Sequence, residues 1–128
     1  MDSGPRRFTD DRTLAVVVRL GAFCCGIEAS LVERLATEPR DPARDRVLAE
    51  LLEVPSDGPP AAWVHLSGAA PALGVDEVMR VEDVGDKAYY ALPTRCRLKR
   101  PAFRGVWATP AGLLPCLDPR GVLAGVST

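Results

Sequence analysis

Short apolar runs rich in β-branched residues dominate the start of this sequence. Residues 14–20 read LAVVVRL, the small pair Gly21 and Ala22 follows, and residues 23–27 read FCCGI. Two apolar runs separated by two small residues are typical of a β-hairpin. Because the first run does not alternate apolar with polar positions, we expect both faces of that strand to be covered. A short helical turn is expected over residues 30–35.

Further strand patterns occur in the second half of the sequence. Residues 63–67 alternate bulky apolar side chains with smaller or polar ones, which predicts a strand. Another strand is predicted over residues 87–92, and Pro93 ends it. Residues 103–108 and 113–117 flank the turn sequence TPAG and therefore predict a second hairpin.

The segment over residues 73–84 has a less regular pattern. Valines recur every three residues, a spacing that fits neither the helical nor the strand period. Valine favours strands, and Gly74 and Gly85 punctuate the segment. We therefore predict extended structure here, with a helix over residues 76–84 as the alternative.

One short amphipathic helix is predicted between the two halves. Asp41 is a favourable N-cap, and Pro42 suits the first helical position. Four apolar residues then share one helical face: Val47, Leu48, Leu51 and Leu52. Pro55 ends the pattern, so we predict this helix over residues 41–54. A last helical turn is expected from Asp118 through Leu123.

The chain matches itself weakly at an offset of 48 residues. The matching pairs preserve residue class: Val16 with Val64, Val18 with Leu66, Cys25 with Leu73, Gly26 with Gly74, Ile27 with Val75 and Glu28 with Asp76. Each copy contains a strand, a small-residue turn and a strand ending in glycine, a β-branched residue and an acid. We therefore predict two related hairpins in one domain. Since the hairpin over residues 103–117 has no counterpart in the first half, one lobe is expected to be complete and the other depleted.

Length and charge are typical of one small domain. The 128 residues carry 16 basic and 17 acidic side chains, for a net charge of −1. This balance gives no overall attraction to nucleic acid or to an anionic membrane. No apolar run approaches the roughly 20 residues of a membrane-spanning helix, so the cytoplasm is the expected location. We predict a loose leader over residues 1–12 and a single domain over residues 13–128, with a first lobe at 13–55 and a second at 61–124.

Candidate catalytic and metal-binding residues do not form a recognisable motif. Cys24, Cys25, Cys96 and Cys116 contain no CxxC pair, so a zinc site is not indicated. His65 is the only histidine, and no nucleophile motif flanks the cysteines. We therefore predict no enzyme, no cofactor and no metal.

A basic cluster near the second hairpin supports an alternative function. Its members are Arg95, Arg97, Lys99, Arg100 and Arg104. This Arg95–Arg104 patch gives the alternative hypothesis, a small β-barrel module that binds nucleic acid. Aromatic residues are not interleaved with these charges, which argues against base stacking.

Two blocks of the second half resemble the CheW-like family of chemosensory adaptors. Residues 73–78, Leu-Gly-Val-Asp-Glu-Val, resemble that family's Gly-x-x-Val-Asp-x-Val strand. Phe-Arg-Gly-Val at residues 103–106, followed by Leu-Leu-Pro-Cys-Leu-Asp at residues 113–118, resembles its Arg-Gly-Val…Leu-x-Pro-x-Leu-Asp ending. Residues 14–32 fit the opening hairpin, so the resemblance covers most of the chain.

The resemblance implies a mainly β fold with two SH3-like barrel lobes and a non-enzymatic adaptor function. Such adaptors bind the cytoplasmic tip of a chemoreceptor and couple it to a CheA-type histidine kinase; another CheW-like adaptor is a further candidate partner. Two strands of the family's first lobe would fall between Leu35 and Asp41 and are absent. The chain thereby resembles the short CheW-like protein of the Frz gliding-motility pathway. Because the family's first lobe contributes to kinase docking, we expect receptor contact to survive better than kinase contact.

Six residues are predicted to form or support an apolar partner-binding groove: Ile27, Val32, Val75, Val78, Phe103 and Arg104. A helix bound in such a groove is a common mode of recognition. Arg104 matches the family motif, but it also has a structural interpretation in which it holds the hairpin against Asp118.

Overall fold

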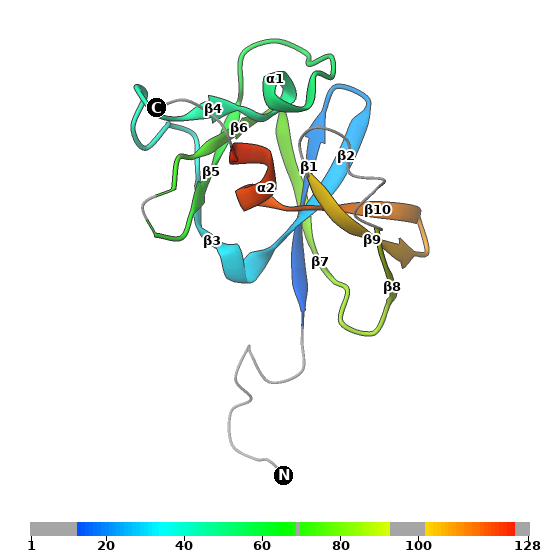
Figure 1. The fold of residues 1–128 in the computed structure, drawn as a ribbon. Coiled ribbons are helices and arrows are strands. Elements are labelled where there is room, and N and C mark those ends of the chain that lie inside the picture. Colours follow the sequence, from blue (N-terminus) through cyan, green and yellow to red (C-terminus); the bar gives the residue numbers. More distant parts are fainter. Residues whose placement is uncertain (1–12, 69, 93–101, 125–128) are drawn as a thin grey trace.

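The apolar runs form strands that belong to two sheets (Figure 1). The computed structural model describes residues 13–68, 70–92 and 102–124, and ten strands lie within them. The six-stranded sheet has the order β7 (Glu77–Asp83), β1 (Leu14–Leu20), β2 (Phe23–Glu28), β10 (Gly112–Leu117), β9 (Phe103–Thr109), β8 (Ala88–Ala91). The four-stranded sheet has the order β3 (Val32–Ala36), β5 (Ala62–Leu66), β6 (Leu73–Val75), β4 (Arg46–Val47). The predicted leader, residues 1–12, lies outside the described residues.

The predicted hairpins are confirmed, and so is the extended structure over residues 73–84. β1 pairs with β2, β5 with β6, and β9 with β10, each antiparallel. Residues 73–84 contain β6 and β7, so the alternative helix is wrong. Two irregularities explain the three-residue valine spacing. The chain crosses between sheets at Asp76, and the pairing of β7 with β1 contains a bulge at Met79.

The predicted helix over residues 41–54 is mostly wrong. Only Leu48–Leu52 is helical, as α1. Asp41 begins a turn rather than a helix, since the N–H groups of Arg44 and Asp45 both bond to its carbonyl oxygen at 2.9 and 2.8 Å. The Arg46 N–H then bonds to the Ala72 carbonyl at 3.0 Å, which turns the chain into β4.

The other helical segments are also short. The turn predicted over residues 30–35 is a 3₁₀ helix at Ala29–Leu31, and the chain then enters β3. The last helical turn is confirmed as α2, Pro119–Leu123. No helix in the described residues is long and apolar enough to span a membrane.

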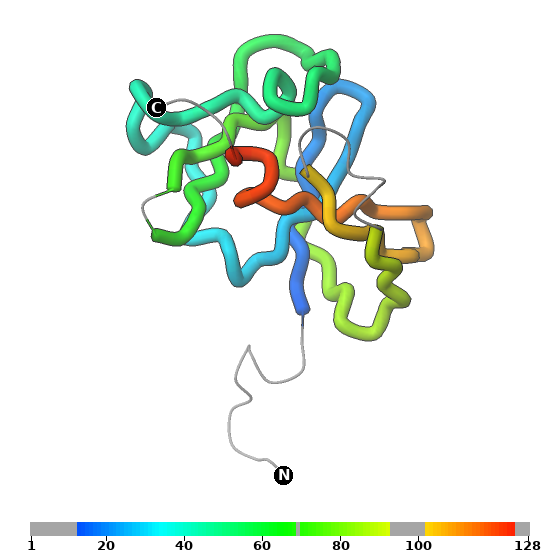
Figure 2. Tube along the Cα trace, viewed as in Figure 1, coloured from blue at the N-terminus to red at the C-terminus, as the bar shows by residue number. Residues whose placement is uncertain are grey.

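The strand that follows each of the β1–β2 and β5–β6 hairpins belongs to the other sheet, and the chain can be followed from β2 to β3 and from β6 to β7 in Figure 2. β3 follows the β1–β2 hairpin but pairs with β5, whereas β7 follows the β5–β6 hairpin but pairs with β1. The two predicted lobes, residues 13–55 and 61–124, therefore each contribute strands to both sheets. The six-stranded sheet takes strands from both ends of the chain, because each hairpin pairs with the strand that follows the other.

The strand register extends the internal repeat beyond the two hairpins. Val32 lies opposite Leu66, and Val78 lies opposite Val18; Val18 and Leu66 are themselves repeat partners. Each pairing then skips one residue, Glu33 in β3 and Met79 in β7. β3 and β7 are thus equivalent strands with equivalent bulges, related by an offset of 46 residues.

The repeat also continues into β4 and α1. β4 pairs in parallel with β6 at Gly74, and β10 pairs in parallel with β2 at the equivalent Gly26. A short helix follows each, and the two helices contact each other. The four-stranded sheet is the depleted one: residues 37–45 connect β3 directly to β4, where the other half of the repeat contains β8 and β9. One of the two strands expected to be absent therefore survives as the two-residue β4.

β1 separates two clusters of buried residues. Val16, Val18 and Leu20 belong to the main core, which includes side chains from both sheets and both helices. Ala15 and Val17 point the other way, into a smaller cluster with Trp107 and Leu114 among others. The prediction that both faces of this strand are covered is confirmed.

Candidate partner-binding groove

An open groove of about 450 Å³ lies between the end of β3 and the start of β7. Its lining comes from three places: β3 and the residues after it, β5, and β7. The residues are Arg34, Leu35, Ala36, Thr37, Glu38, Ala62 and Val78. The groove therefore lies between β3 and β7. These are the exchanged strands, because each pairs with the hairpin of the other half of the repeat.

Exposed apolar side chains lie on both strands that border the groove. Leu35 on β3 is 41% exposed, and Met79 and Val81 on β7 are 42% and 53% exposed. Leu35 and Val81 occupy equivalent positions of the repeat, opposite Val64 and Val16. Among the described residues β3 and β7 are both edge strands. Grouped exposed apolar side chains commonly mark a surface that binds a partner.

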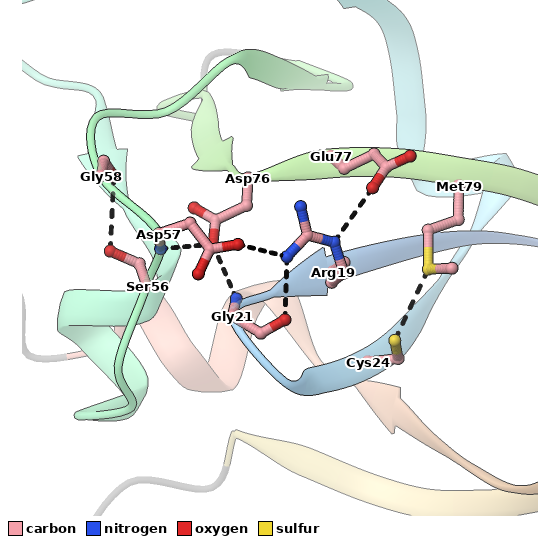
Figure 3. A network of polar contacts seen from close by, with 9 residues as sticks. All are labelled: Arg19, Gly21, Cys24, Ser56, Asp57, Gly58, Asp76, Glu77 and Met79. Carbon is pink, nitrogen blue, oxygen red and sulfur yellow. Dashed lines mark hydrogen bonds and ion pairs between the residues drawn. The ribbon is translucent and has the colours of Figure 1, made fainter.

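An arginine network holds the start of β7 (Figure 3). Arg19 donates from Nε to Glu77 at 3.0 Å, and from Nη1 to Asp57 at 2.6 Å and to the Gly21 carbonyl at 2.9 Å. Asp76 accepts from the N–H groups of Gly21 and Asp57 at 2.6 and 2.9 Å. The two carboxylates, first Asp57 and then Glu77, raise the pKa of Arg19. Asp76 and Glu77 are thus engaged in fixing the crossover to β7.

A second arginine network holds β3. Arg40 donates from Nη2 to Glu33 at 2.9 Å and to the Leu66 carbonyl at 2.8 Å. Its Nη1 donates to the carbonyls of Gly68 and Ala70 at 3.0 and 3.3 Å. One side chain from the shortened connection therefore ties the bulge of β3 to the loop that follows β5.

Asp45 and His65 secure the same shortened connection. Both are buried, at 8% and 6% exposure. The Asp45 carboxylate accepts three backbone N–H groups, from Arg40 at 2.7 Å, Asp41 at 2.9 Å and Ala72 at 2.8 Å. The Nε2 atom of His65 lies 2.9 Å from the Glu38 carbonyl oxygen. The partner of His65 is thus a backbone carbonyl rather than a nucleophile.

The structure separates the six predicted site residues. Ile27 and Val75 are fully buried repeat equivalents, so they can only support a surface from below. Val32 and Val78, another equivalent pair, are half-buried, and Val78 lines the groove. Phe103 packs edge-to-face on Phe23, with ring centroids 5.8 Å apart, and does not line the groove.

Arg104 lies in a second hollow of about 370 Å³ on the six-stranded sheet. Its Nη2 forms an ion pair with Glu28. The structural interpretation predicted Asp118 as the partner of Arg104, so the predicted partner is wrong. The Asp118 N–H instead bonds to the Ala102 carbonyl. Arg104 thus holds β9 to the end of β2. The other four basic residues of the Arg95–Arg104 patch lie outside the described residues.

Sequence reasoning missed the polar lining of the groove, Arg34 and Glu38, together with Leu35. A signal existed: Val32-Glu-Arg-Leu and Val78-Met-Arg-Val are equivalent segments. An alignment at the offset of 48 does not reveal this match. Three residues, Ala29–Leu31, separate Glu28 from Val32, whereas only Glu77 separates Asp76 from Val78, so the equivalent positions of β3 and β7 are 46 residues apart.

The buried cysteines lack the properties of catalytic nucleophiles. Burial raises the pKa of the Cys25 thiol from 9.0 to about 12. Burial also raises the pKa of Cys116, although the nearby Arg104 opposes that shift. Reactive cysteines require a lowered pKa. Among the described residues no group of three or more His, Cys, Asp or Glu side chains could hold a metal ion.

The fold is similar to that of a known scaffolding protein. The crystal structure of the scaffolding protein TtCheW from Thermoanaerobacter tengcongensis superposes with a TM-score of 0.64, covering 91% of this chain and 90% of that one, at 12% sequence identity. No family model matches the sequence, and no curated protein matches it. The predicted mainly β, CheW-like fold is confirmed.

Proposed function

We propose that this protein is a non-enzymatic adaptor of a bacterial chemosensory pathway. It binds the helical cytoplasmic tip of a chemoreceptor in the groove between β3 and β7. The observation that carries the proposal is the fold: about nine-tenths of the chain superposes on a scaffolding protein. The groove adds a site with exposed apolar side chains on two edge strands, and an apolar groove is a common binding site for an amphipathic helix.

The proposed mechanism is pure binding. Arg19 and Arg40 fix the two edge strands through ion pairs with Glu77 and Glu33. Since both strands are anchored before a partner arrives, little conformational entropy is lost on association. Val78 and Leu35 supply apolar contact, and the buried Ile27 and Val75 support it from the core.

Coupling to a CheA-type histidine kinase is proposed to be weakened. Residues 37–45 bridge β3 and β4 directly, so the four-stranded sheet offers less surface than a full lobe. Other CheW-like adaptors remain candidate partners of the complete sheet. A cytoplasmic location and a role of the Frz gliding-motility type are parts of this proposal.

Affinity capture tests the proposal directly. The protein is immobilised, and receptor-tip and kinase fragments from the same genome are applied separately at matched concentrations. We expect the receptor fragment to be retained and the kinase fragment to bind more weakly. Leu35→Asp should abolish receptor capture, whereas Leu113→Asp, on the distant and 69% exposed hairpin, serves as the matched control. Equal affinity for both fragments would overturn the weakened kinase contact, and no receptor capture would overturn the proposed function.

A further inference from the structure

The groove carries two exposed charges without partners in the described part of the chain. Arg34 and Glu38 both line it, and no hydrogen bond or ion pair engages either side chain there. Only the backbone carbonyl of Glu38 is used, by His65. By contrast, the nearby Glu33 and Arg40 neutralise each other at 2.9 Å.

The internal repeat shows that Arg34 differs from its own counterpart. Arg34 and Arg80 lie opposite His65 and Val17, which are repeat partners. Arg80 forms an ion pair with Glu82 at 3.0 Å. The position equivalent to Glu82 in the first half is Ala36, so no carboxylate stands two residues after Arg34. The same strand position is therefore neutralised on β7 and left charged beside the groove.

The strand edges beside the groove favour a helix over an added strand. Strand addition needs a regular edge, and bulges are a known means of blocking it. β3 has a bulge at Glu33 and β7 has one at Met79. The apolar part of the groove lining is formed by Leu35, Ala36, Ala62 and Val78. An amphipathic helix can bury its apolar stripe there while its flanking residues reach the charges.

We propose that the groove selects a helix by charge order: an acidic residue flanks its apolar stripe to pair with Arg34, and a basic residue lies further along to pair with Glu38. The two unpaired charges then fix the direction of the bound helix as well as its identity. This inference rests on the proposed function, since a chemoreceptor tip is the helical partner which that function supplies.

Calorimetric titration with a receptor-tip fragment tests the inference. Arg34→Ala should weaken binding about two- to fivefold, since an ion pair near the protein surface contributes modestly. Arg34→Glu should weaken it more than tenfold, and both variants should reduce the salt dependence of the affinity. The charge-swapped variant R34E/E38R keeps the net charge but should lose more binding than R34E, because both proposed ion pairs become repulsive. Arg80→Ala, the repeat equivalent, is the matched control and should stay within twofold of the wild type.

Synthetic helical hairpins separate this inference from the proposed function. Three probes carry one apolar stripe with flanking residues that are acidic at one end and basic at the other, acidic at both ends, or basic at both ends. We expect the mixed-charge probe to bind best and to lose its advantage with R34E. If the receptor fragment does not bind the wild type, the proposed function fails, while probe preference still decides the charge inference. Equal binding of the three probes, no binding of any, or R34E within twofold of the wild type would overturn it.

Discussion

Arg104 and Gly105 lie side by side on β9 and have distinct structural roles. Arg104 forms an ion pair with Glu28 at the end of β2. A Cβ atom on Gly105 would overlap the ring of Tyr89 and lie 2.7 Å from the Tyr90 carbonyl oxygen. The glycine therefore allows β8 to pack closely, and the Arg-Gly pair of the sequence motif is explained by architecture without a bound partner.

Gly105→Ala is expected to lower the free energy of unfolding by about 1–3 kcal/mol, the usual cost of overpacking. The clash with Tyr89 can relax by side-chain movement, but the one with the Tyr90 carbonyl requires the backbone to shift. Adding Tyr89→Ala to this variant should therefore not recover the part of the lost unfolding free energy that comes from the backbone clash. Urea unfolding of the two variants measures this, and wild-type stability for Gly105→Ala would contradict the packing argument.

The thiols should differ in reactivity according to burial. Cys25 and Cys116 are buried, with raised pKa values, whereas Cys24 is half-buried. Iodoacetamide at pH 8 should alkylate Cys24 well before Cys25 and Cys116 in the folded protein, because little thiolate exists at the buried sites. Peptide mass spectrometry measures the order, and unfolding in urea should remove it. Rapid labelling of Cys116 in the folded state would revive a catalytic interpretation.

The Cys25 thiol also gives the stability a pH dependence with a definite sign. Its pKa is about 12 in the folded state and 9.0 ordinarily, so the folded state binds more protons between these values. Stability should therefore be unaffected by this group below pH 9 and should fall as the pH rises from 9 to 12. Thermal melts of Cys25→Ala should show a shallower alkaline decline than the wild type; equal slopes would contradict the assignment.

At the scale of elements, the shortened connection over residues 37–45 depends on Asp45. Its carboxylate satisfies three backbone N–H groups in a buried position. Asp45→Ala leaves these donors without partners and should cost about 2–4 kcal/mol. Asp41→Ala removes one 3.2 Å bond to the Ala43 N–H and is the control, with an expected loss below about 1 kcal/mol. Chemical denaturation of both variants decides, and equal losses would contradict the central role of Asp45.

The sequence predicts hairpins well here because their signals are local. The lack of alternation in residues 14–20 predicts that both faces of β1 are covered, and they are. β4 was missed because a two-residue strand has no period, and the apolar spacing from Val47 to Leu52 matches a helix. The predicted helix over residues 41–54 is mostly wrong because of a tertiary contact. The Arg46 N–H bonds to the carbonyl of Ala72, which is distant in the sequence, and this bond directs the chain into β4.

The candidate site was only partly predictable, since it depends on which strands meet. Of the predicted site residues, Val78 lines the groove, whereas Ile27 and Val75 are fully buried. Strand order carries this information, and strand order depends on pairing between residues that are distant in the sequence. Arg34 and Leu35 become site residues because β3 pairs with β5 beside β7, which no local pattern indicates.

At the scale of the whole molecule, the exchange of β3 and β7 ties the two halves together. β1 and β2 lie between β7 and β10, so removing them splits the six-stranded sheet. The main core takes buried side chains from both halves, including Val18, Ile27, Val64 and Leu73. Neither half of the repeat therefore retains a complete sheet or core by itself.

Fragment complementation tests this interdependence. The chain is divided after Gly58, which lies in an exposed loop where an added Cβ atom would have no neighbour within 4 Å. Residues 1–58 and 59–128 should each lack a cooperative thermal transition, because domains of this size need most of their core to fold. Mixed at equal concentration, they should recover the near-ultraviolet circular dichroism of the intact chain and a 1:1 mass. Cooperative unfolding of residues 59–128 alone would instead show an independent lobe, and the exchanged strands would then contribute little to stability.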